Sequence, residues 1–356
     1  MRELKKVIGF SQKSFNLEEV QRTIPSDYLV VFFAPVEWME EVGQGISTVY
    51  KSSIGSSSYK DINKNEAEYY SVTFLGIKYD DVRFALLKDV EKKVITYYKE
   101  VSSLGKIYKK NHSILLEFTD GLSRAEESVL TVLTNELRNI PVVGGSSADN
   151  GSFTKTLVCV NGECASNATA LCMLTTPMVI ETYCENIYKP RESKAIITSC
   201  DLFKRKIHEI NNMPAVDFYC KELNTDINNI NSKFISHPIA RRIGERYFVT
   251  SIMNVEGKTF NTYARSFNHS YISICDPINY LKLWDDRSKE IKDKYLGGIF
   301  INCIFRTNLF EEENTMKDFI KYLSAYGEFA CMTSYGEQYC DSHANQTMSV
   351  CLFREC

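Results

Sequence analysis

The sequence lacks most of the short motifs that identify enzymes. It contains no HExxH, GxSxG, GxxxxGK[ST] or GxGxxG pattern, which closes the usual routes to a zinc protease, a serine hydrolase, a P-loop protein or a dinucleotide-binding enzyme. The five histidines are scattered without an i, i+4 pair, so no helix-borne metal site is legible. No internal repeat or low-complexity tract is evident either.

Basic charge and long apolar runs are also scarce. The 42 Lys and Arg residues are outnumbered by 45 Asp and Glu residues, so nucleic acid is not an expected partner. The weakly polar stretches at 168–180 and 295–305 are shorter than the roughly 20 residues that a membrane helix needs. The N-terminus has basic residues but no apolar core after them, unlike a secretory signal. We therefore expect a cytoplasmic protein that does not bind a membrane.

Cysteine is absent from the first 158 residues, and none of the 12 cysteines forms a CxxC pair. Without an export signal, free thiols are a better interpretation than a disulfide framework. Cys340 and His343 lie three positions apart in a polar loop and resemble half of a metal or haem site. They are weak haem-ligand candidates. Cys303 or Cys331 beside Glu337 would be the nucleophile of a cysteine-dependent enzyme, if the protein is one.

A chain of 356 residues can bury two cores. Apolar strand-like runs alternate with amphipathic segments, which predicts an α/β (α+β) fold of two modules with mixed, mainly antiparallel β-sheets flanked by helices. The polar segment Lys189–Ser193 predicts a boundary between modules 1–188 and 189–356. Ser123 and Glu126 form a capping-box pattern for a helix, and Asn161–Gly162 predicts a hairpin between strands at 156–160 and 169–174.

Two Gly-containing segments are the best candidates for a site. Gly144 and Gly145 end a short strand and are followed by Ser-Ser-Ala-Asp. They either line a ligand or permit a strand-to-loop turn that needs positive φ or close backbone approach. Tyr335 and Glu337 flank Gly336 and offer a phenol and a carboxylate to an amine or hydroxyl, unless they are solvent-facing turn residues.

Further candidates lie nearby in the second half. Arg306 follows an apolar strand-like run, where its guanidinium could clamp a ligand carboxylate or form a structural salt bridge. Asn345 and Thr347, in Asn345-Gln346-Thr347, could bind a ligand or satisfy loop backbone groups. The predicted ligand-binding set is Arg306, Tyr335, Glu337, Asn345, Thr347, Gly144 and Gly145.

The order of these motifs resembles the FIST family, with an N-terminal and a C-terminal FIST module. The resemblance rests on the following segments of this sequence, which occur in the family's order: Ile54–Ser58, Thr119-Asp120-Gly121, Val143-Gly144-Gly145 with Asp149, Asn212-Met213-Pro214-Ala215, His237-Pro238, Asn302–Arg306, Tyr335-Gly336-Glu337 and Asn345-Gln346-Thr347.

The resemblance implies an intracellular sensor of a small polar ligand, such as an amino acid. Because the chain ends soon after the second module, we expect its output to pass through a separate partner protein, such as a histidine kinase. Ligand binding is expected to shift an equilibrium between module arrangements. The alternatives are a haem-binding nitric-oxide or redox sensor, a cysteine-dependent enzyme, and a ligand-free interaction scaffold.

Overall fold

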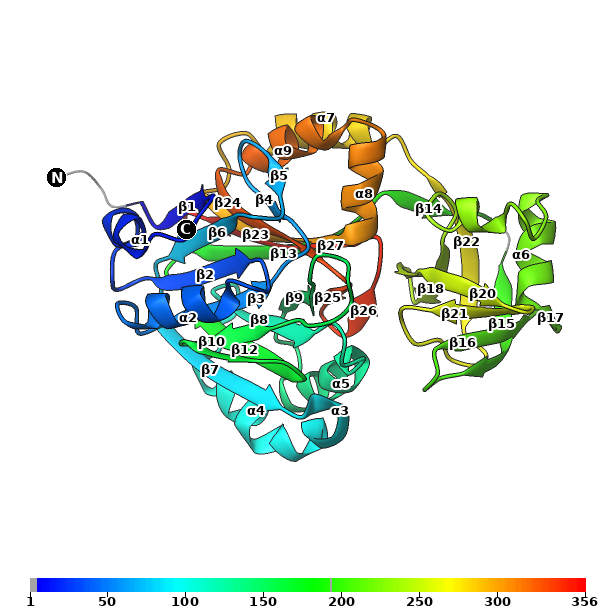
Figure 1. The fold of residues 1–356 in the computed structure, drawn as a ribbon, viewed down its shortest axis with the longest axis horizontal. Helices are drawn as coiled ribbons and strands as arrows, with labels where there is room; N and C mark the ends of the chain where they lie inside the picture. Colours follow the sequence, from blue (N-terminus) through cyan, green and yellow to red (C-terminus); the bar gives the residue numbers. More distant parts are fainter. Residues whose placement is uncertain (1–4, 193) are drawn as a thin grey trace. The chain divides into compact units, whose positions relative to one another are not determined.

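The computed structural model describes residues 5–192 and 194–356 (Figure 1). The first four residues of the predicted signal-free N-terminus, and Ser193 of the predicted boundary, lie outside the described residues. The described chain forms two compact units. The first contains the residues up to Glu185, Leu281–Ser342 and Met348–Cys356, and the second contains Asn186–Tyr280 and His343–Thr347. These units interleave along the chain, so modules 1–188 and 189–356 remain a prediction about the sequence.

The first unit is built from three successive segments with the same order of elements. Each has an outer strand, a helical connection, two parallel strands joined by one or more helices, a short hairpin and a return strand. The first segment comprises β1 (Val7–Gln12), α1 (Leu17–Thr23), β2 (Leu29–Ala34), α2 (Met39–Ser47), β3 (Ser53–Ser57), β4 (Asp61–Ile62), β5 (Ala67–Glu68) and β6 (Val72–Ile77).

The other two segments repeat this order. The second comprises β7 (Asp81–Lys88), α3 (Val90–Lys93), α4 (Tyr98–Leu104), β8 (Ser113–Asp120), α5 (Glu126–Glu136), β9 (Val142–Ser147), β10 (Val158–Val160), β11 (Glu163–Ala165) and β12 (Ala168–Thr175). The third comprises β13 (Val179–Asn186), α7 (Tyr280–Ile291), β23 (Gly297–Cys303), α8 (Ile304–Glu312), α9 (Met316–Ser324), β24 (Glu328–Ser334), β25 (Glu337–Tyr339), β26 (Ser342–Ala344) and β27 (Thr347–Arg354). Most of the second unit, Asn186–Tyr280, is inserted between β13 and α7, and its other residues, His343–Thr347, lie where β26 leads into β27.

Each segment contributes four strands to one six-stranded sheet, in the orders β1-β6-β2-β3, β7-β12-β8-β9 and β13-β27-β23-β24. We call these sheets 1, 2 and 3. Each sheet is completed by a hairpin from another segment: β10–β11 joins β3, β25–β26 joins β9, and β4–β5 joins β24. The hairpins are thus exchanged in a cycle that connects all three sheets. This repeat is not visible in the sequence.

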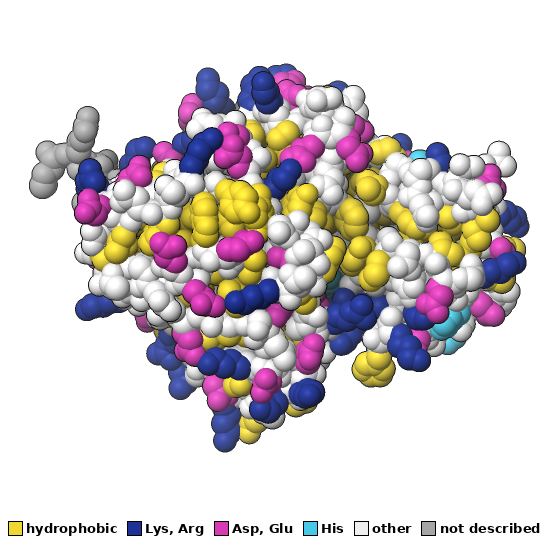
Figure 2. Space-filling view, viewed as in Figure 1, with side chains coloured by type: hydrophobic (Ala, Val, Ile, Leu, Met, Phe, Trp, Pro, Cys, Tyr) yellow, Lys and Arg dark blue, Asp and Glu magenta, His cyan; other side chains and the backbone are white. Residues whose placement is uncertain are grey.

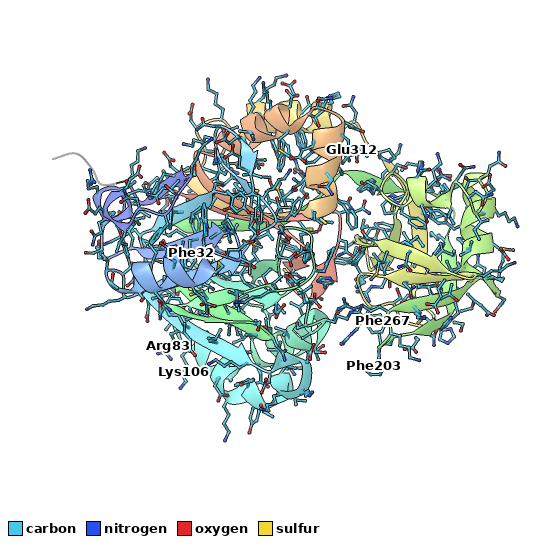
Figure 3. All side chains as sticks on the ribbon, in the orientation of Figure 1. Phe32, Arg83, Lys106, Phe203, Phe267 and Glu312 are labelled. Carbon is cyan, nitrogen blue, oxygen red and sulfur yellow. The ribbon has the colours of Figure 1, made fainter. Side chains whose placement is uncertain are left out.

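One apolar cluster, the central core, contains residues from all three sheets, including Phe33, Phe118 and Ile301. The opposite face of each sheet is covered by helices (Figure 1). Helix α2 packs on sheet 1 around Phe32, which Figure 3 labels, and α4 and α5 pack on sheet 2. Because strand residues alternate between faces, neighbours such as Leu115 and Leu116 enter different cores.

The second unit has its own core around Tyr219, Phe234 and Phe260. Its strands form one antiparallel nine-stranded sheet. They are β14 (Tyr188–Pro190), β15 (Ala195–Asp201), β16 (Lys206–Ile210), β17 (Met213–Pro214), β18 (Ile239–Ile243), β19 (Arg246–Thr250), β20 (Ile252–Glu256), β21 (Thr259–Thr262) and β22 (Tyr271–Pro277), with helix α6 (Ala215–Leu223) packed on them.

The predicted fold class is confirmed, since the sheets are mixed or antiparallel and flanked by helices. Two local predictions are wrong. Ser123 is not the N-cap residue of α5, which begins at Glu126 after Ala125; its hydroxyl donates to the Asp120 carbonyl and accepts from the Ala125 amide. The Asn161–Gly162 turn does form a hairpin, but β10 pairs with β11 and not with the strand at 168–175, which pairs with β7 and β8.

Candidate functional site

The carboxyl ends of the three parallel strand pairs meet in one place. The amides of Tyr59, Ala148 and Tyr335 donate to the carbonyls of Thr333 (3.0 Å), Ser57 (3.0 Å) and Ser146 (3.1 Å), respectively. These are equivalent positions, because each donor lies two residues after the acceptor of its own segment. The amides of Ser57, Ser146 and Thr333 in turn donate to Leu157, Gly336 and Lys60. A cyclic set of backbone hydrogen bonds therefore joins the three strand ends.

Polar side chains occupy the core-facing positions at these strand ends. Alternate residues of a strand face the same side. The central core contains Ile54, Val143 and Met332, so the same side of the sheets carries the serines an even number of residues further on: Ser58, Ser147 and Ser334. Two acids join them from the exchanged hairpins, because Asp61 is the cross-strand partner of Met332 and Glu337 that of Gly145. We call Ser58, Asp61, Ser147, Ser334 and Glu337 the polar layer.

The polar layer is buried and contains an unusual acid. Asp61 and Glu337 are each 1% exposed. Burial raises the pKa of Asp61 well above its usual value, more than the nearby Ser58 hydroxyl and Thr73 amide lower it. Neither Asp61 oxygen has a hydrogen-bond partner of good geometry among the described residues. Glu337, by contrast, accepts a hydrogen bond from Ser334 at 2.7 Å. The layer therefore has hydrogen-bonding capacity that its own side chains do not use.

Tyr335 is held beside the polar layer by the loop that follows β9. Its hydroxyl donates to Asp149, and the Phe153 ring stacks on it with centroids 4.7 Å apart. Burial alone would raise the pKa of Asp149, but Tyr335 and the amides of Thr154 and Phe153 lower it to about 2. Tyr335 and Glu337 thus lie near the same strand end, and the Tyr335 hydroxyl is hydrogen-bonded to the Asp149 carboxylate.

Gly144 and Gly145 lie inside β9, where close approach and not positive φ explains them. A Cβ on Gly144 would overlap the carbonyl oxygen of Glu117, and one on Gly145 would overlap Ile301 and lie 3.3 Å from the Gly336 carbonyl oxygen. Neither residue has a left-handed φ. Gly145 pairs directly with Glu337, so the structure brings both Gly-containing segments together.

Arg306 has a different place from the predicted one. It lies in helix α8, not at the end of the preceding strand, and its side chain is fully buried. Its guanidinium donates to the Glu185 carboxylate at 2.7 Å and to the Glu185 carbonyl at 3.2 Å. Of the two alternatives, this geometry matches the structural salt bridge, while ligand binding by Arg306 stays an untested prediction.

Asn345 and Thr347 belong to the second unit. The side-chain oxygen of Asn345 accepts a hydrogen bond from the Ser251 amide at 3.1 Å, and the backbone amide of Asn345 donates to the Val249 carbonyl. Both residues are buried. Asn345 therefore satisfies backbone groups of its own unit, and a role in ligand binding stays a prediction for both residues.

The cysteines and His343 do not form a recognisable reactive site. His343 is buried, at 5% exposure, and no group of three His, Cys, Asp or Glu side chains able to hold a metal occurs among the described residues. Burial raises the pKa of Cys331 well above its usual value, which disfavours the thiolate form that a nucleophile needs. Cys303 is likewise buried.

Sequence reasoning missed three buried acids: Asp61, Glu117 and Glu185. Glu117 had a usable signal, because it is the one acid within the otherwise apolar run from Ile114 to Phe118. Glu185 and Asp61 have polar neighbours in the sequence, so the sequence gives no sign that these acids are buried. Their burial depends on strand pairing with distant segments, which the local sequence does not reveal.

These features define an α/β protein of three interlocked βαβ segments, with polar side chains gathered where the parallel strands end. Residues 27–213 match the model of the FIST N domain, so the chain belongs to the FIST family, a family of sensory, signal-transduction domains. It is also similar to an uncharacterized protein, MJ1623, of Methanocaldococcus jannaschii, with 22% identity over 350 residues covering 86% of this chain and 67% of the relative.

Two observations concern the surroundings in which such a domain acts. Among the described residues, no helix combines the length and apolar character required to cross a membrane. On the face drawn in Figure 2, acidic and basic side chains of the first unit are interspersed and do not separate by sign. This distribution matches the near balance of charge in the sequence.

Proposed function

We propose that the protein is a sensor that binds a small polar molecule, such as an amino acid, at the polar layer of the first unit. The observation that carries the proposal is the convergence of three parallel strand pairs on buried acids and serines, one of which, Asp61, has unused hydrogen-bonding oxygens. In α/β proteins, ligands bind outside the carboxyl ends of parallel strands. The family supports a sensory role.

The ligand contacts proposed here are Glu337, Asp61 and the Ser58, Ser147 and Ser334 hydroxyls, with Gly144, Gly145 and Tyr335 shaping the strand ends. Carboxylates and hydroxyls together suit a ligand that presents an amino or hydroxyl group. The output passes to a separate partner protein, such as a histidine kinase, and the location is cytoplasmic.

The first test is native mass spectrometry of the freshly purified protein, with intact and denatured masses compared. A small mass that is lost on denaturation identifies a co-purified ligand, and a mass of about 616 Da would instead indicate haem.

The second test is a thermal-unfolding screen against the twenty amino acids. A ligand at a hundredfold excess over its Kd stabilises the native state by about 2.7 kcal/mol. We expect at least one to raise the midpoint of the wild type and of Asp27→Asn, whose carboxylate is exposed, but not of Asp61→Asn. A response retained in Asp61→Asn would place the site elsewhere. Absence of any response together with no co-purified mass would contradict the sensor proposal.

A further inference from the structure

The three equivalent segments allow a position-by-position comparison of the sheet faces that are turned away from the central core. Two residues before Ser57, Ser146 and Thr333 lie Gly55, Gly144 and Cys331. Each is flanked by a residue of the parallel partner strand and a residue of the exchanged hairpin. The three resulting rows are Phe32–Gly55–Cys159, Phe300–Cys331–Ile62 and Glu117–Gly144–Gln338.

Two of these rows are apolar and the third is polar. In the first segment the Phe32 ring covers Gly55. In the second segment Glu117 takes the place of this phenylalanine, and its Oε2 lies 2.6 Å from where a Cβ on Gly144 would be. Sheets 1 and 3 therefore accept a phenylalanine at this position. The fold does not require the acid that sheet 2 has there.

Glu117 is completely buried and incompletely bonded. Its Oε1 accepts a hydrogen bond from Thr119. Its Oε2 has no hydrogen-bond partner among the described residues, although its residue is 0% exposed. Leaving a carboxylate in this state carries a free-energy cost, which a positively charged ligand would offset.

Further oxygen atoms lie on the same face of sheet 2. The Thr119 and Thr169 hydroxyl oxygens lie 2.8 Å apart and form a hydrogen bond. The Ser146 hydroxyl donates to the Glu126 carboxylate at 3.2 Å and accepts from the Gln338 amide at 3.1 Å. Glu126 begins helix α5, and all of these side chains are buried. The group therefore offers two carboxylates and several hydroxyls, which are hard oxygen ligands.

We propose that Glu117, Glu126, Thr119 and Ser146 form a cation site between sheet 2 and helix α5, separate from the polar layer. The site would take a hard cation through oxygen ligands. Because the cluster is buried, a cation that sheds its water is favoured over Mg²⁺, which keeps several waters in protein sites. Two carboxylates balance a divalent ion such as Ca²⁺, and Na⁺ or K⁺ share the same ligand chemistry. The proposal does not depend on the sensor function.

The experiment is thermal unfolding of the full chain after removal of metals with a chelator, titrated with CaCl2, MgCl2, NaCl or KCl at constant ionic strength. We expect Ca²⁺ or one of the monovalent ions to raise the unfolding midpoint progressively with concentration, and Mg²⁺ to have a smaller effect. The shift should disappear in Glu117→Gln. Elemental analysis of the dialysed wild type then counts the bound ion.

Two further variants keep the test decisive. Phe300→Leu alters the equivalent row of the third segment and should retain the full cation response despite lower stability. Glu117→Leu, which restores an apolar row, replaces Glu117→Gln if that variant does not fold. The proposal is overturned if no cation shifts the midpoint, or if the shift persists without Glu117. It is also overturned if only pH, and no ion, distinguishes wild type from Glu117→Gln, since Glu117 would then be a lone protonated acid.

Discussion

Glu117 and Glu185 are two fully buried acids on the helix-covered faces of sheets 2 and 3, and their surroundings are opposite. The Glu185 carboxylate accepts hydrogen bonds from Arg306 at 2.7 Å, Arg287 at 2.8 Å and Tyr322 at 2.7 Å. Burial would raise the pKa of Glu185, but the charge of Arg306 and these hydrogen bonds lower it overall. Glu117 has no cation among its contacts in the described residues, and burial raises its pKa to about 8.

The difference separates a structural acid from one that the fold tolerates at a cost. Glu185 is the last residue of the first unit before the chain enters the second, and Trp284 and Arg287 lie on α7, by which the chain returns. The Glu185 cluster thus ties together the two chain segments that lead to and from the inserted unit. Within the described part of the chain, Glu117 joins no such pair of chain segments through ion pairs, so its presence needs another explanation.

The largest effect is expected from Glu185→Ala. This change leaves Arg306 buried without its partner, and breaking a buried ion pair costs about 3–5 kcal/mol. Urea denaturation measures the loss in the free energy of unfolding. The matched control is Glu18→Ala, which removes the exposed pair of Glu18 with Arg22 and should cost at most about 1 kcal/mol. If both variants lost the same free energy of unfolding, Glu185 would contribute no more to stability than an exposed acid.

The opposite sign is expected from Glu117→Leu in metal-free buffer. The leucine fills the place that Phe32 and Phe300 occupy in the other segments, and it removes an incompletely bonded buried carboxyl. We expect the free energy of unfolding to rise by about 1–3 kcal/mol, again measured in urea. A decrease would show that Glu117 makes a net stabilising contribution and would end the comparison between the rows.

Glu117 should also make stability depend on pH in metal-free buffer. Its pKa is higher in the folded state, at about 8, than the ordinary glutamate value of 4.5 that applies to the unfolded chain. The folded protein therefore binds more protons between these values, and stability falls as pH rises through this window, by up to about 1.4 kcal/mol per pH unit. The measurement is the difference in urea stability between wild type and Glu117→Gln from pH 5 to 8. Parallel curves would contradict the raised pKa.

A smaller effect is expected from Tyr335→Phe, which tests a third acid, Asp149, stabilised by neutral donors. Removing the phenol leaves the amides of Phe153 and Thr154 on the carboxylate, so we expect a loss of about 1 kcal/mol and a higher Asp149 pKa. NMR titration of the Asp149 carboxyl checks the second outcome. An unchanged pKa would mean that the amides alone hold the carboxylate ionised.

Sequence reasoning succeeded where local chemistry decides the structure. The apolar, β-branched run at residues 28–33 favours a strand and forms most of β2, and Pro214 is the N-cap residue of helix α6. It was less accurate where packing intervenes. The amphipathic spacing of residues 90–103 favours one helix, but a 3₁₀ turn at Val94–Tyr97 separates α3 from α4. Arg306 was placed after a strand because its helix α8 follows that strand without a linker.

Short patterns of neighbouring residues predict the fold class, the segments Gly144–Gly145 and Tyr335–Glu337, and the membership of a sensory family. Only the tertiary structure showed that the two segments pair at Gly145 and Glu337, that Arg306 is bonded to Glu185, and that Glu117 stands where two other segments have phenylalanine. The physical reason is that burial, counter-charge and strand register are set by residues far apart in the chain, and the hairpins exchanged between segments place those residues together.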